Sequence, residues 1–290
     1  MRILAIGDFH GRFPKKLKKK VEKLAYDMII SPGDFNGDHH IKLFFKHAYG
    51  TDKDLWEVIG KKKYLDMIKQ NIQEGNKILA YLKRLKMPLF VVTGNHDHAG
   101  WNEVGVRITD NIEPEKSKIA TKTFLLKQKI PTLDFTKAKF QSFDLVGYPR
   151  STYPGIVRKS ELKKYDGGTR WTPERTRKDY MDHKKKMSKL FTDPANTIFV
   201  SHNVPYRTKL DKISSKGHEK ARNKHYGSAL VKELIKTYQP RLVIAGHMHE
   251  NPGKIRIGKT VIINPGAVKD GRCALIELTE KQVRVRLIKA

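Results

Sequence analysis

Apolar positions along the chain follow two spacings, one typical of β-strands and the other typical of α-helices. Short apolar runs in "RILAI", "DMIISPGD" and "PLFVVTGN" predict strands that each end in a polar loop. Between the first two runs, Leu17, Val21 and Leu24 recur at helical spacing with lysines on the other face, and a second stripe of this kind covers residues 61–86. Strand and helix therefore alternate, which predicts a βαβ pattern and an α/β fold.

The second half of the chain continues this alternation and then changes. "NTIFVSHN" and "RLVIAGHMH" predict strands on either side of a helix in "GSALVKELIKTYQ". After them, "KTVIINPG", "CALIELT" and "QVRVRLI" follow one another with only turns between. About 30 residues at the end of the chain are therefore expected to form an antiparallel β-meander.

Residues 101–194 are less regular. "FDLVGYP" predicts a strand, and residues 173–191 predict a helix with Thr172 as N-cap and Pro173 in the first turn. Long loops surround these two segments, and such loops often shape a substrate-binding face. No domain boundary or repeat is evident, so we expect residues 1–290 to form a single domain in which residues 101–194 are an insertion on the substrate side.

Composition limits the class of protein. A chain of 290 residues with 38% hydrophobic residues can bury a sizeable core, and no apolar run approaches the roughly 20 residues of a membrane span. The chain opens directly on a predicted strand, which leaves no room for a signal peptide. We therefore expect a cytoplasmic protein with no membrane partner. The single cysteine, Cys273, lies in an apolar run and is expected to be a small core residue.

The charge is unusual, because 59 Lys and Arg face 30 Asp and Glu and give a formal net charge of +29. Such an excess attracts polyanions, which indicates nucleic acid, nucleotides or other phosphates, although a basic solvated surface explains it equally. Residues 158–189 and 207–224 combine many cations with aromatic side chains, which together can follow a sugar–phosphate backbone. The alternative for the first cluster is the solvated face of the helix predicted over residues 173–191.

Polar side chains with metal-ligand chemistry stand directly after five predicted strands. The carboxyl ends of the strands of an open α/β sheet meet along one edge, so the loops that carry these side chains should converge. A carboxylate or amide in such a loop can also be a turn former or an N-cap, but the joint pattern favours a shared cleft. The seven candidates are Asp8, His10, Asp34, Asn95, His202, His247 and His249.

The residue types indicate what the cleft could hold. Carboxylate, imidazole and amide oxygen without thiolate suit divalent ions such as Mn, Fe, Zn or Mg. The D-x-H and H-x-H spacings place two side chains on the same side of an extended segment. Seven ligands are too many for one catalytic ion, whereas two ions that share a carboxylate fit the number. A pair of ions about 3.5 to 4 Å apart is a known arrangement for displacement at phosphorus.

The ordered series D-x-H, G-D, G-N-H-D, H and G-H-x-H, from Asp8 to His249, resembles the calcineurin-like metallophosphoesterases. The segments "SHNVPYRTKLD", "HYGSALV", "GHMHE" and "NPG" are similar to the small stand-alone phosphoesterases of archaea and bacteria. The resemblance implies a four-layer α-β-β-α sandwich, in which helices flank two mixed β-sheets, and a dinuclear metal centre. It covers most of the chain and includes all five blocks in order.

The same resemblance implies a role for each ligand, with two divalent metal ions as cofactors, Mn first and Fe, Zn, Ni or Mg as alternatives. A bridging water would lose a proton, and the resulting hydroxide would attack phosphorus. His96 would donate a proton to the leaving oxygen, and Asp97 would fix the loop. The first metal would be held by Asp8, His10 and His249, the second by Asn95, His202 and His247, and Asp34 would bridge them.

Several residues beside the motifs also bear on the site. Arg12 could reach a phosphate or be a surface arginine, and His225 is a candidate on the substrate side. The segment "GDFNGDHH" lacks the Asp-Arg pair of the phosphoprotein phosphatases, so a Ser/Thr protein phosphatase is not expected. Without that pair, Asp38 or a main-chain group is left to orient His96. The histidines expected to pack, to face solvent or to lie outside the motif are His39, His40, His47, His98, His183 and His218.

These observations predict a dinuclear-metal phosphoesterase that hydrolyses phosphodiester bonds, with a nucleotide or nucleic acid as the expected substrate. The first alternative is a phosphomonoesterase or pyrophosphohydrolase that uses the same centre on a small substrate, because specificity would lie in the insertion. A non-catalytic metal-binding scaffold is a further alternative, and the presence of all seven ligands and His96 argues against it. The sequence does not predict the oligomeric state.

Overall fold

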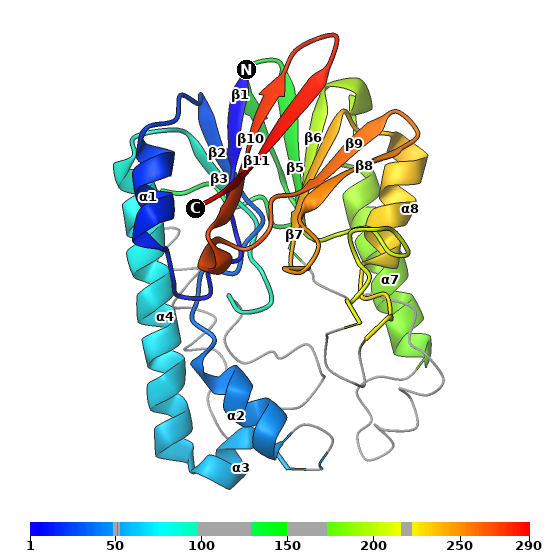
Figure 1. Ribbon diagram of the computed structural model, residues 1–290. Coiled ribbons are helices and arrows are strands. Elements are labelled where there is room, and N and C mark those ends of the chain that lie inside the picture. The colour runs from blue at the N-terminus through cyan, green and yellow to red at the C-terminus, as the bar shows by residue number, and fades with distance from the viewer. Residues whose placement is uncertain (49–50, 52, 98–128, 150–172, 216–221) are drawn as a thin grey trace.

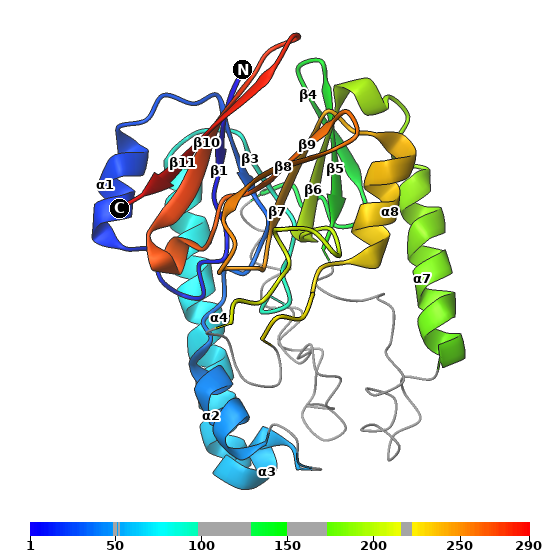
Figure 2. The same ribbon diagram turned by 45° about the vertical axis from the view of Figure 1, so that its right-hand side comes forward.

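Two β-sheets stack face to face between two layers of helices, as Figures 1 and 2 show. The computed structural model describes residues 1–48, 51, 53–97, 129–149, 173–215 and 222–290. Both sheets contain parallel and antiparallel strand pairs. The predicted four-layer α-β-β-α sandwich with two mixed sheets is therefore confirmed.

The first sheet has the strand order β11-β10-β1-β2-β3. Its strands β1, β2 and β3 run parallel, whereas β10 lies antiparallel to both β1 and β11. The strands are β1 (Arg2–Ala5), β2 (Met28–Ser31), β3 (Leu89–Val91), β10 (Arg272–Leu278) and β11 (Val283–Lys289). The three apolar runs predicted as strands in the first hundred residues are thus neighbours in one sheet.

The second sheet has the order β4-β5-β6-β7-β9-β8. Its four inner strands are parallel, and each edge strand is antiparallel to its neighbour. The strands are β4 (Lys137–Phe140), β5 (Phe143–Tyr148), β6 (Thr197–Asn203), β7 (Leu242–Gly246), β8 (Gly253–Ile257) and β9 (Thr260–Asn264). Parallel inner strands are buried on both faces, which is why their sequences are continuous apolar runs.

Helices cover the outer faces of both sheets (Figure 1). The helices on the first sheet are α1 (Lys15–Glu22) and α4 (Lys61–Arg84), and those on the second are α7 (Pro173–Ser188) and α8 (Ala229–Tyr238). Strand residues alternate between the layers, since Ile3 of β1 lies in the core between the sheets whereas Leu4 packs with α1 and α4. The predicted stripe residues Leu17 and Val21 are both buried in α1.

A small helical unit extends beyond the sheets at the amino-terminal half of α4 (Figure 1). It consists of α2 (His39–His47) and α3 (Leu55–Ile59), which pack on α4 around Phe44, Leu55 and Tyr64. Neither α2 nor α3 was predicted from the sequence. Two single-turn 3₁₀ helices, η1 (Pro194–Asn196) and η2 (Val268–Asp270), complete the described elements.

The predicted carboxy-terminal meander is wrong. β9 pairs with β7 and β8 in the second sheet, whereas β10 and β11 form a hairpin in the first sheet. The chain therefore crosses between the sheets after β9. The physical reason lies in burial, because all five residues of β9 are buried and the strand needs a neighbour and a covering layer on every side. The strand β8 that flanks it was missed, since its polar residues alternate along an exposed edge.

Other expectations can be placed on this fold. Cys273 is buried in β10, as expected, and burial raises the pKa of its thiol to about 12. Of residues 101–194, the described parts supply β4, β5 and α7 to the second sheet and its helix layer. Among the described residues, no helix is both long and apolar enough to cross a bilayer. The single-domain organisation stays a prediction.

Candidate metal centre

The seven predicted ligands come from the ends of five strands that belong to different sheets. Asp8, Asp34 and Asn95 follow β1, β2 and β3 of the first sheet, and His202 and His247 lie at the ends of β6 and β7 of the second. The strand pattern alone had indicated the edge of one open sheet, and this is corrected: the loops meet between the edges of two sheets. The stacking of the sheets therefore decides which side chains come together.

Two groups of side chains each bring their ligand atoms to within 4.8 Å of one another. All but one of the seven predicted ligands belong to these groups, and the seventh, Asn95, contacts the second group directly through His202. The first group contains Asp8, His10, Asp34 and His249, and the second contains Asp34, His202 and His247. Asp34 is the member that both groups share.

Asp34 lies symmetrically between the groups. Its Oδ2 atom is 3.5 Å from Nε2 of His10 and 3.5 Å from Nε2 of His202. Its other oxygen, Oδ1, accepts the backbone N–H of His96 at 2.9 Å. Because the side chain is 1% exposed, the carboxylate is held in the interior between imidazoles from both sheets.

The first group combines two carboxylates with two facing imidazoles. Nε2 of His10 lies 3.0 Å from Nε2 of His249, which is itself 3.6 Å from Oδ1 of Asp8. Burial alone would raise the pKa of Asp8, but the hydrogen bond and charge of His249, with smaller contributions from His202 and the His247 N–H, together lower it. Burial likewise opposes protonation of His249, yet Asp8 raises its pKa. Asp8 therefore attracts positive charge at His249, whereas burial lowers the pKa of His10 well below its ordinary value.

In the second group, a nitrogen atom and an oxygen atom face each other in an arrangement that a bound cation would stabilise. Nδ1 of His202 donates to the carbonyl oxygen of Pro32 at 2.7 Å, while Nε2 lies 2.7 Å from Oδ1 of Asn95. A neutral imidazole has a single N–H, so with that hydrogen on Nδ1 two electron-rich atoms face each other. A divalent ion accepts such a nitrogen and oxygen pair, and the backbone carbonyl would fix the ring orientation from behind. The residues present thus fit the metal chemistry expected from their types.

The ligand loops adopt backbone conformations that are rare outside glycine. The φ angles are 55° at Asp8, 46° at His10, 58° at Asp34 and 68° at His247. Residues in this left-handed region cost free energy and persist where the surrounding structure determines them, often at functional sites. Four of the seven candidates are held in this way, so the side chains are aimed by the backbone.

Glycines in the motifs make room for the carboxylates. A Cβ atom at Gly94 would collide with Oδ1 of Asp34, and one at Gly246 would lie 2.6 Å from Oδ2 of Asp8. Gly94 begins the G-N-H-D block and Gly246 begins the G-H-x-H block. Both glycines are therefore required by close approach of another chain segment.

Asp97 joins the loops that follow β2 and β3. Its two oxygens accept four backbone N–H groups at 2.8 to 3.1 Å, from Asp34, Phe35, Asn36 and Gly94. Burial raises the pKa of this carboxyl to about 6, although the hydrogen bonds oppose the shift. The carboxylate of Asp97 thus fixes the backbone on which both Asp34 and Asn95 are mounted.

His96 lies against the first ligand group. Its ring is 4.6 Å from the ring of His10, edge to face, and 5.9 Å from the ring of His40. Burial, followed by the neighbouring charge of His40, lowers the pKa of His96 well below its ordinary value. Asn36 holds the His96 backbone by donating its side-chain N–H to the His96 carbonyl at 3.1 Å. His96 is therefore a neutral imidazole at the edge of the ligand groups.

The two remaining candidates, Arg12 and His225, lie outside the two ligand groups. Arg12 is exposed, with Nη2 3.5 Å from Oδ1 of Asp38. Nδ1 of His225 donates to Oδ1 of the buried Asp211 at 2.8 Å. His98 lies outside the described residues. Asp38, a residue expected to orient His96, has its Oδ2 atom 3.8 Å from Nδ1 of His10 instead.

His40 is a neighbour of the site that was expected merely to pack or face solvent. Its Nδ1 accepts the side-chain N–H of Asn71 at 3.0 Å, and Asn71 is buried on α4. The carbonyl of Asn71 also accepts the N–H of Gly37 at 3.0 Å. In the sequence, this contact is indicated only by the polar Asn71 among the apolar positions predicted over residues 61–86. A buried polar residue needs a hydrogen-bond partner.

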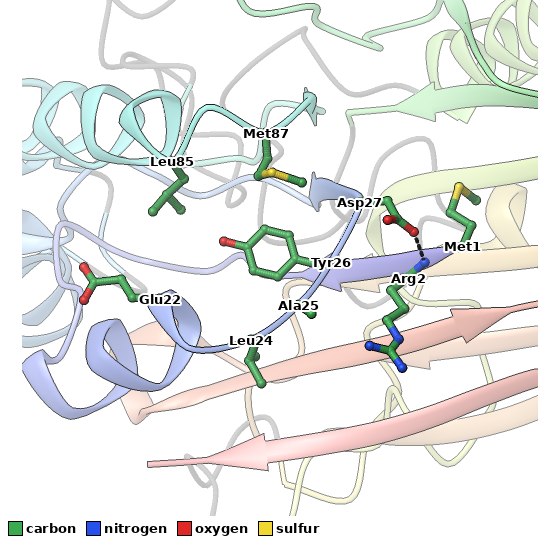
Figure 3. A pocket seen from close by; sticks show the side chains of 9 residues that line it. All are labelled: Met1, Arg2, Glu22, Leu24, Ala25, Tyr26, Asp27, Leu85 and Met87. Atoms are coloured by element: carbon green, nitrogen blue, oxygen red, sulfur yellow. Dashed lines mark hydrogen bonds between the residues drawn. The ribbon is translucent and has the colours of Figure 1, made fainter.

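A cavity elsewhere in the protein is separate from these residues. It has a volume of about 610 Å³ and lies at the amino ends of β1 and β2, the ends opposite to the ligand loops (Figure 3). Tyr26, Leu24 and Met87 line it, and the N–H of Arg2 donates to Asp27 at 2.6 Å beside it. No candidate ligand contributes to its wall, so this cavity is not part of the candidate metal centre.

Comparison with known proteins agrees with this geometry. Residues 180–288 match the family model described as metallophosphoesterase of the calcineurin superfamily. The structure has the fold of this class and the matched residues have its sequence, so the predicted resemblance is confirmed. The matched segment is less than half of the chain, and the resemblance implies a hydrolase that uses divalent metals.

Individual relatives are distant. A segment of 103 residues is 28% identical to the uncharacterized protein MJ1162 of Methanocaldococcus jannaschii, and the match spans 34% of this chain and 45% of that protein. The structure of TT1561 from Thermus thermophilus covers 98% of this chain and 97% of its own with a TM-score of 0.53 and 18% identity. A dimetal phosphatase from Danio rerio covers 99% and 95% with a TM-score of 0.50 and 10% identity. These structures show a shared fold.

Proposed function

We propose that the chain is a dinuclear-metal phosphoesterase that hydrolyses phosphodiester bonds. One observation carries the proposal: Oδ2 of Asp34 lies 3.5 Å from an imidazole nitrogen of each ligand group. A carboxylate that two ligand sets share is what a bridging ligand requires. The donors are oxygen and nitrogen without thiolate, which suits Mn and also Fe, Zn, Ni or Mg.

Each ligand then has a role in holding the metals. Two divalent ions would neutralise charge on the phosphoryl oxygens and lower the pKa of a bound water. His202 is oriented from behind by the carbonyl of Pro32, and Asp97 fixes the loops of Asp34 and Asn95. The first ion would be held by Asp8, His10 and His249, the second by Asn95, His202 and His247, with Asp34 between them.

His96 would supply the proton to the leaving oxygen. Burial keeps its imidazole neutral in the free protein, whereas a phosphoester anion bound beside it favours the protonated form. His96 would therefore gain its proton as substrate enters and transfer it from the ring nitrogen to the departing oxygen. The backbone contacts of His96 with Asp34 and Asn36 keep the ring beside the ligand groups.

The proposed substrate is a nucleotide or nucleic acid. The support is the net charge of +29, which favours a polyanionic partner. If this is right, single-stranded DNA or RNA binds to the protein at low salt, and the affinity falls by at least about tenfold between 50 and 200 mM salt as counterions compete. Absence of binding at low salt would contradict this part of the proposal. A cytoplasmic location stays a prediction.

Turnover of two chromogenic esters tests the reaction itself. Purified protein supplied with Mn is expected to hydrolyse bis(p-nitrophenyl) phosphate faster than p-nitrophenyl phosphate, and EDTA should abolish both reactions. Preference for the monoester would instead support the phosphomonoesterase alternative. Metal binding without turnover of either ester would support the non-catalytic scaffold. A protein that holds no divalent metal and stays active in EDTA would refute the dinuclear mechanism.

A further inference from the structure

Two cations beside the first ligand group share a single carboxylate. Nη2 of Arg12 lies 3.5 Å from Oδ1 of Asp38, and Nζ of Lys269 lies 3.2 Å from Oδ2 of the same side chain. The Arg12 side chain is 62% exposed, whereas that of Lys269 is 21% exposed. Two positive charges thus face one negative charge, with the lysine deeper in the protein and the arginine at its surface.

The three side chains lie at the rim of the candidate metal centre. Arg12 follows His10 by two residues, and Oδ2 of Asp38 is 3.8 Å from Nδ1 of His10. Burial is the main cause of the lowered pKa values of His10 and His96, and the positive charge of Lys269 contributes to both. Lys269 is therefore close enough to act electrostatically on a ligand and on the proposed proton donor.

The backbone holds Lys269 in this place. Lys269 belongs to η2, whose residue Val268 is buried and donates its N–H to the carbonyl of Gly7 at 3.0 Å. The Lys269 N–H lies 3.4 Å from the carbonyl oxygen of Asp8. The turn that carries the lysine is thus held to the loop of Asp8, so the Lys269 backbone has a fixed place beside the candidate centre, and Asp38 holds its ammonium group at 3.2 Å.

We propose that Arg12 and Lys269 form a subsite for a second phosphate group of the substrate, next to the phosphate that reacts. This inference rests on the proposed function and specifies its substrate class as nucleotide esters that carry an additional phosphate. A phosphate group would replace Asp38 as the anionic partner of Arg12 and Lys269. The guanidinium group would donate paired hydrogen bonds to it, and the ammonium group would contribute a compact positive charge. The excess of one positive charge in the cluster favours this exchange.

Binding of two product-like ligands tests the subsite without relying on turnover. Calorimetric titration of the protein in Mn would compare thymidine 3′,5′-bisphosphate with thymidine 5′-monophosphate at one ionic strength, with released phosphate assayed after each run. The wild-type protein is expected to bind the bisphosphate about tenfold more tightly, as one added ion-paired phosphate contact allows. Arg12→Gln and Lys269→Gln should each reduce this ratio to about threefold or less.

A matched variant separates the subsite from general charge. Lys281→Gln makes the same charge change in the exposed turn between β10 and β11 and should leave the ratio unchanged. Equal binding of the two ligands by the wild-type protein would overturn the subsite, as would an equal loss of the ratio in Lys281→Gln. Failure of diester hydrolysis, by contrast, would count against the proposed function, while the binding ratio would still decide the subsite.

Discussion

The carboxylate of Asp97 holds the backbone of Asp34 through a hydrogen bond of 2.8 Å from the Asp34 N–H, although 63 positions separate the two residues. Asp34 has a left-handed backbone conformation, which few side chains adopt without support. Asp97 supplies that support and also accepts the N–H of Gly94 at the start of the neighbouring loop. The position of Asp34, the candidate ligand that both groups share, therefore depends on Asp97, which belongs to neither group.

Replacing the shared carboxylate should remove the metals. Asp34→Asn keeps the shape of the side chain but loses the charge between the ligand groups, so bound metal should fall from about two ions to one or none and turnover by more than about 100-fold. Elemental analysis of the purified protein and ester hydrolysis measure these effects. The same charge change at exposed Asp27, at the other end of the sheet, should leave both unchanged. Full metal content in Asp34→Asn would contradict the bridging role.

Asp97→Asn should weaken both the fold and the centre. An amide nitrogen would face backbone N–H groups that the carboxylate now accepts, so the free energy of unfolding should fall by about 2 to 3 kcal/mol. Metal affinity should fall by about 10- to 100-fold, because the ligand loops lose their support. Chemical denaturation and metal titration measure the two effects. Asp193→Asn makes the same change at an exposed position and is the control. Unchanged metal affinity in Asp97→Asn would show that the loops of Asp34 and Asn95 keep their conformation without the Asp97 carboxylate.

His96→Ala should separate chemistry from metal binding. The variant should keep its metals, because His96 belongs to neither ligand group, and lose about 100- to 10,000-fold in turnover of esters with poor leaving groups. Leaving groups that depart without protonation should be affected far less. A series of aryl esters of increasing leaving-group pKa measures this dependence. A uniform loss across the series would instead assign His96 a positioning role.

The metal-free protein should lose stability as the pH falls. Burial lowers the pKa of His40 to about 4, so between about pH 6.5 and 4 the unfolded chain binds up to about one proton more at this residue than the folded chain. The free energy of unfolding therefore rises with pH across this window and is lost as the pH falls through it. His40→Gln should flatten the curve measured by denaturation at several pH values. His47→Gln, at an exposed position, should follow the wild-type curve.

The candidate ligand set could be predicted from the sequence because each candidate lies at or shortly after the end of an apolar strand. Asp8, Asp34 and His247 needed only that local pattern and the convergence of strand ends. The sheet to which β9 belongs could not be predicted in this way. Its run of apolar residues fits a strand of either sheet, and the choice depends on packing against β7, which is distant in sequence.

Lys269 and His40 show a second limit. Lys269 is one of 59 cations, and nothing local marks it, since its place beside Asp38 follows from the hydrogen bond between η2 and Gly7. His40 lies beside His96 because α2 packs on α4, and α2 was not predicted. Residues that support a site only through tertiary contacts do not occur in a recognisable sequence motif, whereas residues that form the site often do.

The facing imidazoles of His10 and His249 are separated by 239 positions, and the strand that precedes each belongs to a different sheet. The candidate metal centre can therefore form only after both sheets have formed and stacked. Metal affinity and global stability are then one linked equilibrium, so each ion bound to the native state raises the melting temperature. The amount of metal bound to this chain would therefore report the fraction of molecules in which both sheets have folded and stacked.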